Sequence, residues 1–190
     1  MERRRFLQYV IAAPLLPLAG CRRQRRDGRA LADAGTDRSS PLVLTRQEWD
    51  TLEAVAGRII PSDEDPGARE AGVVGYIDAQ LAHPPVSGFR RLIGSGLRRL
   101  DLLAGRLHRR GFAQLPPEQQ DQVLWMLQRA RRGPGQTGQQ FFMILVVLTL
   151  EGFLCDPLYG GNHGGVGWKL LAFAPRDPTL RRPYRGRALG

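Results

Sequence analysis

The sequence has few cysteines, almost no lysine and none of the common catalytic motifs. It has two cysteines, and arginine supplies all but one of its 28 basic residues, the exception being Lys169. No Cys-x-x-Cys-His motif occurs, so the chain cannot attach a c-type haem itself. No Gly-x-Ser-x-Gly motif occurs either. The residues themselves therefore give no support for catalysis.

The first residues have the pattern of a twin-arginine export signal. Arg3 and Arg4 precede Phe6 and Leu7, and a short apolar stretch follows. Such a signal directs export and is not part of the folded domain. The twin-arginine route is typical of proteins that fold, or assemble around a cofactor, before they cross the membrane.

A lipobox ends this signal, which spans residues 1–21. Leu-Ala-Gly precedes Cys21, and this pattern predicts that the cysteine is acylated and becomes the mature N-terminus. The apolar stretch contains two prolines and is shorter than the roughly 20 residues of a spanning helix, so it is a signal segment and not a membrane anchor. Arginines directly after Cys21 oppose export by the general route and suit a twin-arginine passenger. We expect a lipid-anchored protein in the periplasm or on the outer face of the cytoplasmic membrane.

The positive charge is densest towards the two ends of the chain. The formal net charge is +10, a value often typical of nucleic-acid binding. Residues 22–43 predict a flexible, arginine-rich tether, and residues 176–190 a basic tail. An exported protein rarely meets nucleic acid, so we expect no nucleic-acid partner and place the tails near anionic lipid headgroups.

Residues 44–175 predict a single compact all-α domain. Apolar residues recur at helical spacing, and no strand pattern or internal repeat appears. A glycine-rich loop, residues 156–168, follows the last helix. Five helices are expected, at about residues 46–60, 68–82, 89–110, 117–131 and 138–154.

The first helix has the clearest start. Thr45 and Glu48 have the spacing of a capping box, and Leu44 and Trp49 stand at the two positions of a hydrophobic staple. Pro61 stops the helix. Spacing also predicts the inward positions of the later helices: Val73, Val74, Ile77 and Leu81 in the second; Leu92, Ile93, Leu97, Leu100, Leu103 and Leu107 in the third; Val123, Leu124, Trp125 and Leu127 in the fourth.

Three further local features are interpreted from sequence. The acidic turn before the second helix lacks the spacing of a calcium loop, so Asp65 or a neighbour is expected to cap that helix. Gly94 and Gly96 indicate either a break in the third helix or a close helix contact. The fifth helix is apolar on all sides, which predicts either a central place in the core or coverage by a partner.

The glycine-rich loop does not fit a phosphate site. A P-loop lysine directly follows the last glycine, but here Trp168 lies between Gly167 and Lys169. The glycines are expected instead to permit positive φ angles and close backbone approach. His83, His108 and His163 are too far apart in sequence to predict a metal site.

Cys155 stands alone if Cys21 is acylated. A buried free thiol and an intermolecular bridge both remain open for it. A thiol site made with His163 is a rival hypothesis, although an isolated loop histidine is usually a hydrogen-bonded surface group.

Two segments resemble the gluconate 2-dehydrogenase subunit 3 family. The first runs from Leu-Thr-Arg-Gln-Glu-Trp at residue 44 to Pro-Gly-Ala-Arg-Glu-Ala-Gly-Val at residue 73. The second runs from Phe-Phe at residue 141 through Glu-Gly-Phe and Asp-Pro-Leu-Tyr-Gly-Gly-Asn to Gly-Val-Gly-Trp-Lys at residue 169. Residues 84–135 match only as amphipathic helices.

The resemblance implies a non-catalytic helical subunit without a cofactor or metal of its own. Its partner would be a large FAD-dependent alcohol or sugar dehydrogenase of the glucose–methanol–choline oxidoreductase type, often completed by a multihaem cytochrome c. The small subunit would help the catalytic subunit to mature and to leave the cell through the twin-arginine translocase. A stand-alone exported lipoprotein scaffold is the alternative.

The fifth helix and the following loop are the predicted docking surface for this partner. Aromatic side chains dominate interface energetics, although ordinary packing inside the subunit is an equal alternative for them. Cys155 and His163 cannot be matched to the family pattern, and a covalent bridge between subunits is left open. The predicted interface residues are Glu151, which we expect to be paired, Phe153, Cys155, Tyr159 and Trp168.

Overall fold

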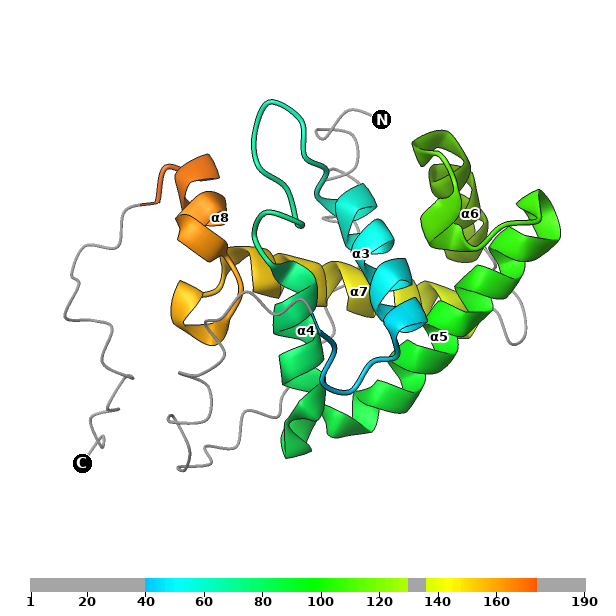
Figure 1. Cartoon of the computed structure of the whole chain (residues 1–190), viewed down its shortest axis with the longest axis horizontal. Helices are drawn as coiled ribbons and strands as arrows, with labels where there is room; N and C mark the ends of the chain where they lie inside the picture. The colour runs from blue at the N-terminus through cyan, green and yellow to red at the C-terminus, as the bar shows by residue number, and fades with distance from the viewer. Residues whose placement is uncertain (1–39, 130–135, 174–190) are drawn as a thin grey trace.

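The computed structural model describes residues 40–129 and 136–173. The predicted signal, most of the tether and the basic tail lie outside these residues. The described part is helical and has no strand (Figure 1), which confirms the all-α prediction. Its α-helices are α3 (Arg46–Ile59), α4 (Val73–Ala82), α5 (Pro84–His108), α6 (Pro117–Arg129), α7 (Gln136–Leu154) and the short α8 (Val166–Leu170), with 3₁₀ turns at Phe112–Gln114, Pro157–Tyr159 and His163–Gly165.

Helix α7 is the centre of the fold. It packs against α3, α4, α5 and α6, and it runs behind α3 and α4 in the view of Figure 1. Its length and its apolar character on every side suit this position. Its buried side chains include Phe141, Phe142, Leu145, Val146 and Phe153.

The start of α3 confirms the predicted capping box. The Thr45 hydroxyl accepts a hydrogen bond from the Glu48 backbone N–H at 3.2 Å, and the Glu48 carboxylate accepts one from the Thr45 N–H at 3.0 Å. Leu44 and Trp49, at the staple positions, are both buried. Glu48 also pairs with Arg98 of α5, so the cap ties two helices together.

A buried carboxylate that the apolar pattern did not predict holds the chain before α3. Asp78 of α4 is 1 % exposed and accepts hydrogen bonds from the backbone N–H groups of Leu42, Val43 and Leu44. Arg90 of α5 donates to the Val43 carbonyl. The chain therefore reaches α3 through a segment fixed between α4 and α5.

The second predicted helix starts later than expected. Gly72 has φ +68° and acts as the N-cap of α4 without a side-chain hydrogen bond, so the preceding residues form a turn. The prediction that Asp65 or a neighbour caps this helix is wrong, because the N-cap position is Gly72. The carboxylate that closes the preceding turn is that of Glu70. The Glu70 carboxylate accepts hydrogen bonds from the Gly67 N–H at 2.7 Å and the Ser62 hydroxyl at 2.6 Å. These bonds to its charged form lower the pKa of Glu70.

Helix α5 begins earlier than predicted and is continuous. The prolines that end α4 occupy the first turn of α5, where no helical N–H is required. Gly96 accommodates the ring of Phe141, since a Cβ there would lie 2.3 Å from that ring. The close-contact alternative is thus the correct one. The prediction that Leu107 faces inward is wrong: it is 41 % exposed, and Ala104 completes the buried row instead.

Asp78→Asn is expected to lower the free energy of unfolding by about 2–4 kcal/mol. The amide keeps one acceptor oxygen and brings an N–H₂ donor to buried N–H groups, which would lose their partner. Asp50→Asn is the matched control, because Asp50 joins only an exposed i,i+4 pair with Arg46; it is expected to cost less than about 0.5 kcal/mol. Urea titration measures both, and equal effects would contradict the bracing role of Asp78.

Candidate partner interface

Asn162 organises the glycine-rich loop. It is fully buried, its side-chain oxygen accepts a hydrogen bond from the Gly167 N–H at 2.8 Å, and its amide donates to the Cys155 carbonyl at 2.9 Å. Its own N–H donates to the Gly152 carbonyl at 2.8 Å. Asn tolerates its left-handed φ of +47° better than most residues do. These bonds close the loop onto the end of α7.

Two glycines let the backbones of α7 and the loop approach closely. A Cβ at Gly167 would lie 2.0 Å from the Phe153 carbonyl oxygen, and one at Gly161 would lie 2.3 Å from the Gly152 oxygen. Other loop glycines have positive φ, among them Gly160 and Gly165. Both expected roles of the glycines are therefore confirmed.

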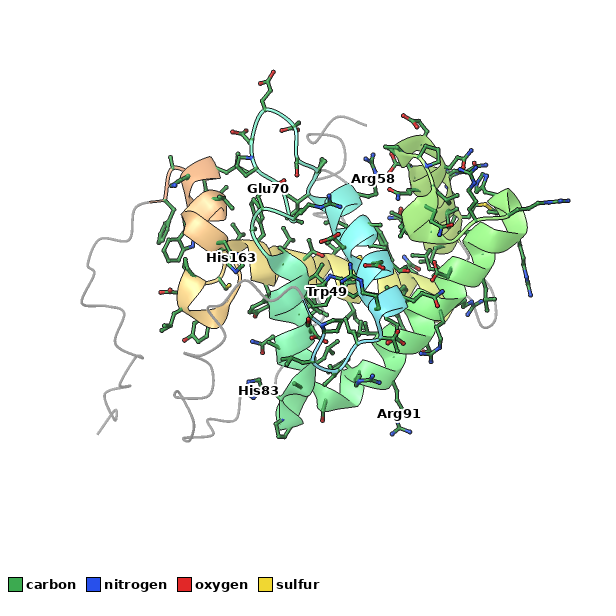
Figure 2. The ribbon with its side chains drawn as sticks, viewed as in Figure 1. Trp49, Arg58, Glu70, His83, Arg91 and His163 are labelled. Carbon is green, nitrogen blue, oxygen red and sulfur yellow. The ribbon has the colours of Figure 1, made fainter. Side chains whose placement is uncertain are left out.

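The loop also contacts the turn before α4. The His163 N–H donates to the Ala71 carbonyl at 3.1 Å, and a Cβ at Gly72 would lie 2.2 Å from the His163 ring. Figure 2 shows His163 between this turn and α8. The two segments that resemble the subunit 3 family, far apart in sequence, thus meet at this point.

Cys155 is a free, half-buried thiol. Its Sγ lies 3.5 Å from the Gly152 carbonyl, to which it donates, and burial raises the pKa of the thiol to about 11. The His163 ring nitrogen is 3.1 Å from the Gly160 carbonyl. Cys155 thus bonds to the backbone of α7 and His163 to that of the loop, which argues against a thiolate–imidazole site.

The three predicted aromatic anchors lie at different depths. Phe153 is 3 % exposed and belongs to the core, so its predicted place at the docking surface is wrong, and the packing alternative applies. Trp168 is half-buried; its Nε1 donates to the Leu154 carbonyl at 2.9 Å, and its ring meets Phe173 edge-on. Tyr159 is 39 % exposed and is available to a partner.

Several exposed apolar side chains lie in the C-terminal part of the described chain. They come from the end of α7, from the 3₁₀ turn after it, and from α8 and the residues that follow, at one end of the molecule (left in Figure 1). Clustered exposed apolar residues are typical of interaction sites. We call this set the C-terminal apolar surface: Leu154, Leu158, Tyr159, Leu170, Leu171 and Phe173.

A comparison with known protein families identifies the family to which this chain belongs. The family model of gluconate 2-dehydrogenase subunit 3 matches residues 46–175. The chain belongs to the gluconate 2-dehydrogenase subunit 3 family. No curated protein and no solved structure matches it significantly. The match begins at the first residue of α3 and includes the whole C-terminal apolar surface.

Glu151 lies at the edge of this surface of the subunit 3 domain. Its exposed side chain is on α7, three residues before Leu154, and partial removal of the carboxyl group from water raises its pKa. It makes no ion pair within residues 40–129 and 136–173. Its expected charged partner therefore stays a prediction about another chain.

Within the same described ranges, the subunit 3 domain has no group of three or more His, Cys, Asp or Glu side chains placed to hold a metal ion. No helix in that part of the chain has the length and apolar character needed to cross a membrane.

Gly167→Ala is expected to lower the free energy of unfolding by about 2–3 kcal/mol, because the new methyl group would overlap a backbone carbonyl that cannot rotate away. Gly57→Ala is the control. Gly57 lies within α3 with nothing near its Cβ position, and the change should raise stability by about 0.5–1 kcal/mol. Thermal or urea unfolding would measure both, and a neutral Gly167→Ala would contradict the close backbone contact.

The Cys155 thiol is expected to react slowly in the folded subunit. Burial disfavours the thiolate, so at pH 8 a disulfide reagent should modify it about 100-fold more slowly than in urea. The rate should then rise with pH towards about 11. The full chain with Cys21→Ser isolates this thiol. Similar rates in the folded and unfolded protein would instead support an activated cysteine.

Proposed function

We propose that this chain is the non-catalytic small subunit of an FAD-dependent alcohol or sugar dehydrogenase complex of the gluconate type. Family membership supports a place in a dehydrogenase complex. The C-terminal apolar surface carries the proposal further, because it offers leucine and aromatic side chains to another protein. In this account the flavin belongs to the large subunit, and haem c to a possible cytochrome subunit.

The partner is expected to cover the C-terminal apolar surface. Leu154, Leu158 and Phe173 are each more than a third exposed, so contact with an apolar face would remove much carbon surface from water. Trp168 is held against the end of α7 by its bond to the Leu154 carbonyl, which limits the ordering cost of binding. A basic group of the large subunit would pair with Glu151 at the edge.

Assembly before export follows from the same proposal. The predicted twin-arginine signal suits a passenger that is already folded, and a large subunit without a signal would cross the membrane bound to this one. Acylation of Cys21 would then hold the complex at the periplasmic face. The small subunit acts in this scheme as an export partner and an anchor, while the chemistry takes place on the flavin of its companion.

Leu154→Asp combined with Leu158→Asp is expected to reduce co-purification with the large flavoprotein subunit at least tenfold. The two carboxylates would have to be buried without partners in the interface. The measurement is co-expression of the full chain with a candidate large FAD-dependent subunit, followed by purification and cell fractionation. The flavoprotein should also remain in the cytoplasm with this variant. The same result is expected for Arg3→Lys combined with Arg4→Lys, which alters the predicted twin-arginine signal.

Leu102→Asp is the matched control. Leu102 is 64 % exposed on α5, away from the C-terminal apolar surface, so this variant should still bind and export the flavoprotein. If the unaltered chain does not co-purify and the flavoprotein reaches the periplasm without it, the chain is a stand-alone lipoprotein scaffold and the proposal is wrong.

A further inference from the structure

The outward face of α5 carries a row of arginines. At 100° per residue, the positions of Arg91, Arg98, Arg99 and Arg106 fall within about a third of the helix circumference. Leu102, 64 % exposed, lies in the middle of the row. Two more exposed arginines follow at the end of the helix. We call this set the α5 basic face: Arg91, Arg98, Arg99, Arg106, Arg109 and Arg110, all exposed.

This clustering is a matter of placement and not of overall composition. Basic and acidic side chains are nearly equal in number over the described residues, and within the α5 basic face Arg98 shares its charge with Glu48 of α3. Asp101, the one acid of α5, turns inward, and its carboxylate accepts hydrogen bonds from Thr51 and from the Phe112 N–H. In Figure 2, Arg91 points away from the bottom of the molecule, while the acidic loop at residues 62–66 lies at the top. The outward face of α5 therefore carries arginines with no acidic residue of the same helix among them.

The chain reaches the domain beside the α5 basic face. Arg90, next to Arg91, donates to the Val43 carbonyl, and Asp78 holds the neighbouring N–H groups. The loop before α3 accordingly lies between α4 and α5 (Figure 1). An anchor attached through the preceding residues would therefore approach the domain near α5, and not at the C-terminal apolar surface.

We propose that the α5 basic face rests on an anionic lipid surface. That the protein lies at a membrane rests on the proposed function. That α5 is the side facing the lipid rests on the arginines of α5 itself. Guanidinium groups bind phosphate oxygens well, and each basic residue near an anionic bilayer adds attraction. The row from Arg91 to Arg106 spans about 22 Å, and Leu102 can enter the headgroup boundary between its charges.

A lipid surface fits this face better than a protein does. A protein interface normally has an apolar core surrounded by polar groups, whereas this face has one leucine among arginines. The C-terminal apolar surface has the opposite character. With α5 on the lipid, the subunit would hold its flavoprotein partner at a fixed orientation relative to the membrane.

The test is co-sedimentation of the full chain, carrying Cys21→Ser so that no acyl chain anchors it, with vesicles of phosphatidylcholine and phosphatidylglycerol, compared with phosphatidylcholine alone. Arg91→Gln combined with Arg106→Gln should weaken binding to the anionic vesicles roughly tenfold or more. Arg69→Gln combined with Lys169→Gln removes the same charge elsewhere on the domain and should bind almost as the unaltered chain does. High salt should release all three proteins from the vesicles. Circular dichroism and melting curves would show that each variant is folded.

Three results would overturn the assignment: no binding of the unaltered chain to anionic vesicles, equal losses in the two double variants, or a loss of flavoprotein co-purification in the α5 variant with vesicle binding intact. The first two leave the proposed function standing, because co-purification with the flavoprotein is measured separately. Conversely, the unaltered chain could still bind anionic vesicles through α5 if it had no flavoprotein partner.

Discussion

The close backbone contact between the end of α7 and the glycine-rich loop is the constraint on which the C-terminal third depends. Gly161 and Gly167 lie against carbonyl groups at distances that no side chain allows, and Asn162 supplies the hydrogen bonds that hold them there. The loop in turn packs on the turn before α4 through His163. Leu158, Tyr159 and α8 have defined positions because this contact exists. A surface built in this way is rigid before a partner arrives, which lowers the ordering cost of association.

Local sequence signals predicted the elements well where a short-range interaction determines them. The Thr45–Glu48 capping box is formed within four residues, so spacing alone identifies it. The start of α4 escaped prediction because Gly72 takes a left-handed conformation, which a run of apolar residues does not reveal. Asp78 escaped for a related reason: its partners are backbone N–H groups far away in the sequence, and only the tertiary fold brings them to it.

The candidate surface was harder to predict than the fold. Periodicity identifies a buried face only when a helix has a polar side, and α7 has almost none. The sequence could therefore predict a docking region at the end of α7 but could not separate Phe153, which is buried, from Leu154, which is exposed. Glu151 marked the outward side, but a single charge does not define a face. Aromatic character alone was a poor guide, since most of the exposed apolar residues are leucines.

The contact between His163 and Ala71 also has a consequence for biosynthesis. The turn before α4 leaves the ribosome long before the loop that must pack on it, and α8 follows later still. The final arrangement therefore requires nearly the whole described chain to have been translated. The proposed recognition of a companion through Leu154, Leu158 and α8 would accordingly be a post-translational event between finished polypeptides. The relative rates of synthesis of the two chains would then be part of how a complex forms.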